Sequence, residues 1–259
     1  MTEIREKGRV RLTAGLLLKS GLHIGAGKDS VEIGGIDNPV IKHPFTGEPY
    51  IPGSSLKGKL RFLLEWAFGA IRNDGQAWGF NDQQPADTTD PVLRIFGNAL
   101  KEWHGGPTRL LMRDAPLCEK DRQRYLEAPD SFFEEKTEVL INRISGKAHD
   151  RVGPRQTERV PAGVTFDFEC VFRLYDTADD GVRDLACLNW LLQGLALLEE
   201  DALGGSGSRG YGRIEFTGLT LHVPEREALA LDNRFRGHRF DRAQAPAILR
   251  AEEILGVPA

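Results

Sequence analysis

Two leucine-rich segments with helical spacing, each lying between segments that alternate like β-strands, constrain the fold of this 259-residue chain more than any other feature. Apolar side chains recur at helical spacing over residues 54–68, and again at the leucines of residues 185–195. The segments that read as strands are residues 10–24, 110–117, 137–144, 165–175 and 213–223. The chain therefore runs strand, helix, strand, strand, helix, strand, with one additional strand or hairpin.

This order is that of a ferredoxin-like domain, so we predict an α+β fold with a ferredoxin-like core. Residues 71–109 are polar and rich in turn-forming residues, and we interpret them as an insertion that covers the core. Residues 142–163 are too polar for the core and should project as a long loop or irregular hairpin. We expect one domain over residues 1–223 and a C-terminal extension over residues 224–259.

The composition describes an ordinary globular protein, with 40% hydrophobic and 28% charged residues. No apolar run is long enough to cross a bilayer, and the first residues lack a secretory apolar segment, so we expect a cytoplasmic protein without a membrane partner. Cys118, Cys170 and Cys187 lie far apart without zinc-ligand spacing, which favours buried, reduced thiols.

The charge is unevenly distributed along the chain. The formal net charge of −4 argues against a nucleic-acid ligand. However, residues 142–160 carry five Lys or Arg against two acids, whereas residues 176–201 carry seven acids against one Arg. The sequence therefore predicts one basic and one acidic face.

Two glycine-rich motifs match nucleotide-binding patterns only in part. GSSLKGK at 53–59 begins like a P-loop, but Leu60 replaces the hydroxyl residue that would bind magnesium. GSGSRG at 205–210 follows a helix and leads into a strand, the reverse of a dinucleotide-binding site. Neither motif supports a nucleotide site.

Basic residues begin the first predicted helix, where they oppose the helix dipole. Lys57, Lys59 and Arg61 lie there, with Ser54 as the candidate N-cap. A phosphate on the free N–H groups of residues 54–56 would resolve the conflict, and solvated surface lysines are the alternative. Residues 204–212 contain five glycines beside Arg209, which suits either an anion-binding loop or a mobile connector.

Two further residues have both a functional and a structural interpretation. His23, at the end of the first strand, could stack on a base, act on a proton or serve the structure. Asp37 has no second carboxylate or His at catalytic spacing, so spacing alone favours a turn role before Asn38 and Pro39.

Seven segments together resemble one family, the backbone subunits (Csm kind) of type III-A CRISPR RNA-guided effector complexes, within the RAMP superfamily. They are GLHIGAG (21–27), GGIDNPVIKHPFTGEPYIPGSSLKGKLR (34–61), RIFGN (94–98), RDA (113–115), NRISGKAHDRVGPRQTERV (142–160), TFDFE (165–169) and LGGSGSRGYGRIEF (203–216). The resemblance covers roughly residues 9–223. Outside RIFGN, the insertion at 71–109 has no counterpart in it, and neither has the C-terminal extension.

The resemblance implies an RNA-recognition (RRM-type) fold with an added lid at 71–109 and a protruding thumb at 142–163. It implies further copies of the chain in a filament along a CRISPR guide RNA, other type III effector subunits as partners, and cleavage of the complementary target RNA at regular intervals. Asp37 would be catalytic and the candidate ligand of a divalent cation, Mg²⁺ or Mn²⁺. The RNA-binding candidates are His23, Ser54, Lys57, Lys59, Arg61, Arg143, Lys147, Arg151, Arg155, Arg159 and Arg209.

An exposed Asp is a weak base at neutral pH, so positioning should dominate catalysis. The target nucleotide would flip so that its 2′-hydroxyl lies in line with the scissile phosphorus, with Asp37 orienting that hydroxyl or holding hydrated Mg²⁺. In this scheme Ile144 or Val152 would displace a base. Two alternatives remain: a non-cleaving RNA-binding scaffold, and a nuclease that processes precursor guide RNA with His23 as its base.

Overall fold

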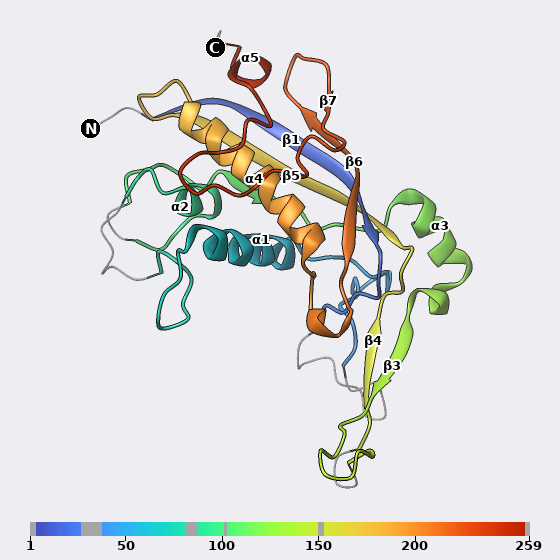
Figure 1. Ribbon diagram of the computed structural model, residues 1–259. Helices are drawn as coiled ribbons and strands as arrows, with labels where there is room; N and C mark the ends of the chain where they lie inside the picture. Colours follow the sequence, from blue (N-terminus) through green and yellow to red (C-terminus); the bar gives the residue numbers. More distant parts are fainter. Residues whose placement is uncertain (1–3, 27–37, 81–86, 101–102, 150–152, 257–259) are drawn as a thin grey trace.

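The computed structural model describes residues 4–26, 38–80, 87–100, 103–149 and 153–256. Its largest element is a five-stranded antiparallel sheet in the order β2-β5-β1-β6-β7 (Figure 1). The strands are β1 (Arg5–Leu18), β2 (Leu110–Met112), β5 (Thr165–Asp176), β6 (Ile214–His222) and β7 (Leu229–Ala230).

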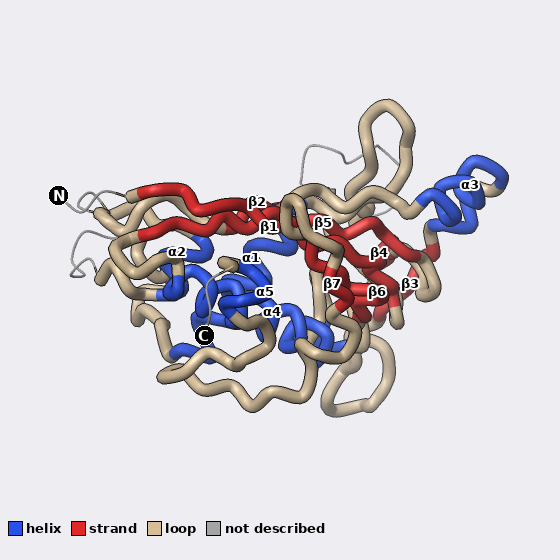
Figure 2. Tube along the Cα trace, turned by 90° about the horizontal axis from the view of Figure 1, so that it is seen from above, coloured by secondary structure: helices blue, strands red, loops and turns tan. Residues whose placement is uncertain are grey.

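One face of this sheet is buried under two long helices. Figure 2 shows α1 (Gly53–Phe68) and α4 (Val182–Glu200) on the same side of the strands. Successive side chains of a strand point to opposite faces, so alternate residues enter the core. Leu12, at the centre of β1, pairs with Cys170 of β5 and Leu221 of β6, and all three are fully buried.

Helix α1 begins one residue before the predicted N-cap. Ser54 is exposed within the first turn, and the carboxylate of Asp114 accepts a 2.7 Å hydrogen bond from the N–H of Gly53. An acid 61 residues along the chain therefore supplies the negative charge that the helix N-terminus favours. The helix ends at Gly69, whose φ of 71° is the left-handed conformation typical of a glycine C-cap.

A second, two-stranded sheet projects from the body of the protein (Figure 1). It consists of β3 (Glu134–Glu138) and β4 (Arg155–Arg159). The predicted strand at 137–144 starts too late, because the EEKTE sequence of β3 has no apolar alternation to reveal it. The sequence prediction also missed α3 (Glu119–Glu127) and the 3-10 turn η2 (Pro129–Phe132), which connect β2 to this hairpin.

The first strand was also predicted too far along the chain. Its pairing with β6 ends at Leu18, and after it the N–H groups of Lys19 and Ser20 bond to the carbonyl of Arg213. Further along, Leu22 forms an isolated bridge with Val160, the residue after β4, rather than with β6. Leu22 is therefore buried, and Ile24 partly buried, without forming a continuous strand.

The 71–109 insertion is anchored to the core by α2 (Pro91–Phe96). Asp90 caps this helix by accepting a 2.9 Å bond from Leu93 N–H. Arg61 of α1 donates to the carbonyls of Trp78 and Gly97, which ties the loops on both sides of α2 to α1.

The C-terminal extension packs onto α4 and includes α5 (Ala251–Ile254). Asn189 of α4 donates to the carbonyl of Leu249 and accepts from its N–H, at 3.1 and 2.8 Å. Phe235 and Ile248 of the extension are buried. Across the described ranges, no helix is long and apolar enough to span a membrane.

Candidate nucleic-acid interface

Asp37, the candidate catalytic residue, and Arg151 both lie outside the described residues. The structure does describe the chain on each side of residues 27–37. Residues 24–26 and 38–41 run side by side, and we call this pair of segments the neck. Its bonds join Ile41 N–H to Ile24 carbonyl (2.8 Å) and Ala26 N–H to Pro39 carbonyl (3.2 Å).

Strand β4 of the projecting hairpin is bonded directly to the neck. The N–H of Glu158 donates to the carbonyl of Asn38 at 3.0 Å. The Glu158 carboxylate accepts from Val40 N–H and from the ammonium of Lys42, each at 2.8 Å. Its side chain is only 6% exposed, so one buried acid connects the hairpin to the segment after Asp37.

His23 lies where the neck, β4 and the glycine-rich loop meet. Its Nδ1 is 2.7 Å from the carbonyl of Glu158. A carbonyl can only accept, so Nδ1 carries a proton, and in the neutral ring Nε2 is the acceptor nitrogen. The carbonyl of His23 accepts from Gly205 N–H at 2.9 Å. His23 therefore has a structural role that leaves Nε2 as its chemically active atom.

The glycine-rich loop makes close approaches that require glycine. A Cβ on Gly204, whose φ is 76°, would lie 2.4 Å from the carbonyl oxygen of His23. A Cβ on Gly212 would lie 1.9 Å from the carbonyl of Leu203. The loop includes the short 3-10 turn η3 (Gly207–Arg209), and the Arg209 side chain is 67% exposed, 3.6 Å from Glu138.

The hairpin and the glycine-rich loop enclose a hollow of about 450 Å³. Cationic and aliphatic side chains both line it, a combination that suits the phosphates and faces of a nucleic acid. The lining residues are Lys136, Glu138, Val139, Leu140, Ile141, Arg143, Gly153, Arg155 and Arg209. Val139, Leu140 and Ile141 are each about half exposed.

The tip of the hairpin is a hydrogen-bonded turn that displays one aliphatic side chain. The Asn142 side-chain oxygen accepts from Ile144 and Ser145 N–H groups at 2.9 and 3.2 Å. Gly146 closes the turn with a φ of 69° and an N–H bond to the Asn142 carbonyl. Ile144 is 99% exposed at this tip, and its neighbours Arg143 and Lys147 are also exposed.

Arg159 differs from the other hairpin cations. Its Nε lies 2.5 Å from Glu134, and its guanidinium lies 4.8 Å from the ring centroid of Tyr211. Only 20% of the side chain is exposed, whereas Arg155 at the other end of β4 is exposed. Arg159 thus fastens the base of the hairpin, and Arg143, Lys147 and Arg155 are available on its surface.

The three cations of α1 are in three different environments. Arg61 is bonded to Glu65 at 2.7 Å and to the insertion, and Lys59 is 3.2 Å from Asp201. Lys57 is half-buried, and burial, assisted by the nearby charge of Arg61, lowers the pKa of its ammonium. These contacts support a structural role for Arg61 and leave Lys57 as the α1 cation whose charge is least compensated.

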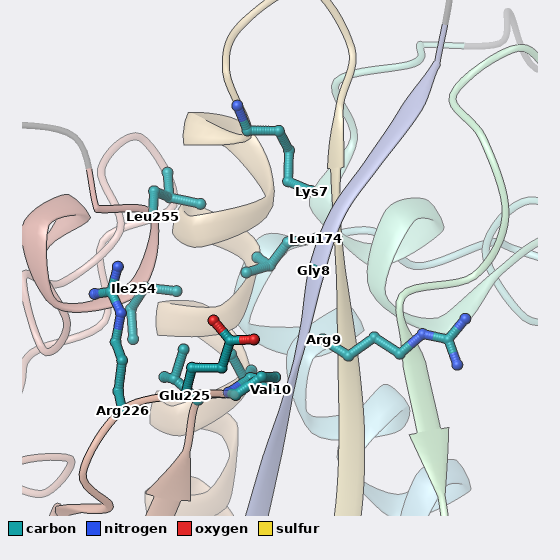
Figure 3. Close-up of a pocket in the computed structure, with 11 residues that line it drawn as sticks. Lys7, Gly8, Arg9, Val10, Leu174, Glu225, Arg226, Ile254 and Leu255 are labelled. Carbon is teal, nitrogen blue, oxygen red and sulfur yellow. The ribbon is translucent and has the colours of Figure 1, made fainter.

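A second hollow, of about 440 Å³, lies at the other end of the sheet (Figure 3). Two of its cationic groups are already engaged: Lys7 is 3.4 Å from Asp180, and Arg226 donates to the carbonyls of Glu252 and Glu253. Arg9 points away from Val10, toward the opposite side of β1. This hollow belongs to the packing of the C-terminal extension.

The sequence analysis missed Glu158 and Asp114. Both had a local signal: Glu158 is one of two acids in an otherwise basic segment, and Asp114 follows a basic residue in the RDA motif. Their partners lie 118 and 61 residues away in the sequence, which no local pattern reveals.

Comparison with known proteins identifies the family. The RAMP superfamily model matches residues 16–215. The chain is 41% identical over 211 residues to the CRISPR system Cms endoribonuclease Csm3 of Streptococcus thermophilus, covering 82% of this chain and 88% of that protein. It is 39% identical over 224 residues to the protein of that name from Methanothermobacter thermautotrophicus, covering 81% and 84%.

Solved structures agree with these relatives. A crystal structure of the Csm3-Csm4 subcomplex of the type III-A CRISPR-Cas interference complex contains a chain that is 28% identical. The match has a TM-score of 0.53 and covers 87% of this chain and 90% of that one. A chain of the Type III-B Cmr-beta complex bound to cognate target RNA, at 17% identity and a TM-score of 0.51, shares the fold.

Proposed function

The chain belongs to the RAMP superfamily, and we propose that it is the guide-RNA-binding backbone subunit of a type III CRISPR effector complex that also cleaves guide-paired target RNA. The observation that carries this proposal is the bonding of the basic projecting hairpin, through β4, to the neck beside Asp37. The hairpin, for which we propose contact with RNA, and the residues that directly follow Asp37 thus form one hydrogen-bonded unit.

We propose further that the large sheet with α1 and α4 is a ferredoxin-like core. The order β2-β5-β1-β6, with a helix after β1 and another after β5, supports this interpretation. In the same proposal the 71–109 insertion is the lid and the β3–β4 hairpin is the thumb.

The exposed cations of the thumb would contact the phosphates of the guide and target. Arg143 and Arg155 line the same hollow as Arg209, and Lys147 is exposed at the tip, so all four are candidates for this role. Ile144 would enter the base stack, because a fully exposed aliphatic side chain on an ordered turn can unstack a base step at a cost of a few kcal/mol. Val152, the other candidate wedge, lies outside the described residues.

Displacing a base would allow the target 2′-hydroxyl to align with the scissile phosphorus. The 2′-oxygen then forms a bond to phosphorus as the bond to the 5′-oxygen breaks. The 2′-hydroxyl loses its proton and the departing 5′-oxygen gains one. The products are a cyclic phosphate and a 5′-hydroxyl, and Asp37 would orient the attacking hydroxyl.

We propose Mg²⁺ or Mn²⁺ as a cofactor because the resemblance implies one, with Asp37 as its candidate ligand. Within the described residues, no group of three or more His, Cys, Asp or Glu side chains could hold a metal ion. The described residues thus supply no metal site of their own, and the steps above are written without one.

The test is cleavage of matched target RNA by the complex reconstituted with guide RNA, in Mg²⁺ or in EDTA. We expect cuts at regular intervals in Mg²⁺, and we expect Asp37→Ala to abolish them while target affinity is unchanged, because a loop carboxylate facing RNA contributes repulsion rather than binding. Binding without cutting in any metal would indicate a scaffold. Cutting of repeat RNA by the isolated chain in EDTA would indicate a guide-processing nuclease that uses His23.

A further inference from the structure

We infer that Glu158 is a positioning residue for target cleavage, through which the projecting hairpin fixes the backbone that follows Asp37. This inference rests on the proposed function, in which Asp37 acts on the target. Glu158 itself need not touch RNA, because its carboxylate is buried and faces the neck.

The first argument is the number of bonds that one residue makes to a short segment. Glu158 bonds through its own N–H to Asn38, and through its carboxylate to Val40 N–H and Lys42. Asn38 directly follows Asp37 in the chain. Two bonds to the backbone and one to a side chain therefore hold this five-residue segment, which restricts it more than one bond would.

The second argument is the position of Lys42 between the two sides of the hairpin. Its ammonium lies 2.8 Å from Glu158 of β4 and 3.9 Å from the ring centroid of Phe133, the residue before β3. Both sides of the hairpin therefore contact Lys42, the residue that directly follows the neck. A displacement of the hairpin, such as RNA would cause at its tip, changes the geometry of both contacts together.

The third argument is energetic. Burying a carboxylate against one lysine costs desolvation free energy, and such ion pairs are often no more stabilising than apolar residues of similar size. The ion pair between Glu158 and Lys42 should therefore contribute little to the free energy of unfolding. It does provide a defined geometry, which catalysis by alignment requires, because a displacement of about 1 Å can lower a rate about 100-fold.

The test compares three variants in the reconstituted complex. Glu158→Ala removes both carboxylate bonds, whereas Glu158→Gln keeps an oxygen for Val40 N–H and loses the charge together with the bond from Lys42. Glu135→Ala is the matched control, because Glu135 is exposed and pairs directly with Glu158 across the hairpin. The measurements are the single-turnover cleavage rate constant, the dissociation constant of the target, and hydrogen exchange at the Val40 amide.

We expect Glu158→Ala to lower the rate constant about 10- to 100-fold with unchanged target affinity, and to speed Val40 exchange. Glu158→Gln should recover most of the rate, and Glu135→Ala should change nothing.

If Glu158→Ala frees the Val40 amide but cleaves at the normal rate, or weakens target binding as much as cleavage, the inference is wrong. If Glu158→Ala fails to assemble, Lys42→Met takes its place, and a normal cleavage rate in that variant overturns the inference.

The Asp37→Ala complex separates this failure from failure of the proposed function. Normal cutting by that complex removes Asp37 from the chemistry, and the positioning role fails with it. An inactive Asp37→Ala complex beside a fully active Glu158→Ala complex contradicts the positioning role alone.

Discussion

At the scale of single residues, the buried carboxylate of Asp184 in α4 accepts hydrogen bonds from three other residues. It accepts from Arg94 of α2 at 2.7 Å, from Arg109 at 2.8 Å and from Tyr175 N–H at 2.8 Å. All three charged side chains are at most 1% exposed. One acid therefore balances two guanidinium groups and joins the insertion to the core.

We predict that Asp184→Asn lowers the free energy of unfolding by about 3–5 kcal/mol, because it leaves two buried cations without a counter-charge. Chemical denaturation of the isolated chain measures this loss. Asp180→Asn is the control: Asp180 is 73% exposed beside Lys7, and its loss should change stability by less than about 1 kcal/mol. Equal effects of the two substitutions would contradict the role given to Asp184.

Lys57 gives a prediction that links stability to pH. Burial lowers the pKa of its ammonium below 10.5 in the folded chain, so the unfolded chain binds more protons between the two pKa values. This residue therefore makes stability rise with pH across that alkaline window, and its destabilising effect is complete at neutral pH.

Lys57→Met should accordingly raise the melting temperature at about pH 7 and remove the alkaline rise. The same variant should lower the slope of log K against log salt for guide binding by about one if Lys57 contacts a phosphate. Lys147→Met, on the exposed hairpin tip, should share the change in slope without the change in melting temperature. A lower melting temperature for Lys57→Met would show that its aliphatic packing matters more than its charge.

At the scale of elements, the hairpin has almost no apolar residues in its strands, and its geometry comes from its two ends. At the base, Arg159 and Glu158 fasten it to Tyr211 and the neck. At the tip, Asn142 and Gly146 close an ordered turn. A polar hairpin that is ordered at both ends is more typical of a rigid wedge than of a surface loop without a function.

We predict that Ile144→Ala lowers cutting at the regular positions about tenfold while guide binding is unchanged, because the target remains stacked and its 2′-hydroxyl out of line. The readout is the cleavage ladder of the reconstituted complex. Leu126→Ala on α3 is the control, since Leu126 is another exposed aliphatic residue, 61% exposed, outside the hairpin. A ladder with its normal intensity in Ile144→Ala would show that this side chain does not displace a base.

At the scale of the whole molecule, different segments of the chain gather at the two ends of the large sheet. The neck, the glycine-rich loop and the hairpin lie together at one end, and the C-terminal extension packs at the other (Figure 1). If copies polymerise along a guide, each copy brings its own neck and hairpin. Cut positions should then reflect the repeat of the protein rather than the sequence of the target.

Mixing wild-type and Asp37→Ala chains tests this arrangement. With equal amounts of each in the reconstituted complex, we expect every band of the cleavage ladder to keep its position and to fall to about half its initial rate, because each linkage depends on one copy. Loss of nearly all cutting in the equal mixture would instead mean that each site needs several intact copies.

The order of β1, α1, β2, β5, α4 and β6 could be predicted from the sequence, because apolar periodicity is a local property that survives in α1, α4, β5 and β6. Periodicity failed where a strand is polar, as in β3, or where apolar residues are buried outside a strand, as after Leu18. At the candidate site, the resemblance supplied Asp37 and the thumb cations. The hydrogen-bond partners of Arg61, Asp184 and Glu158 could be identified only in the folded structure, because each residue contacts groups tens of residues away. Such pairings are set by packing rather than by any local pattern.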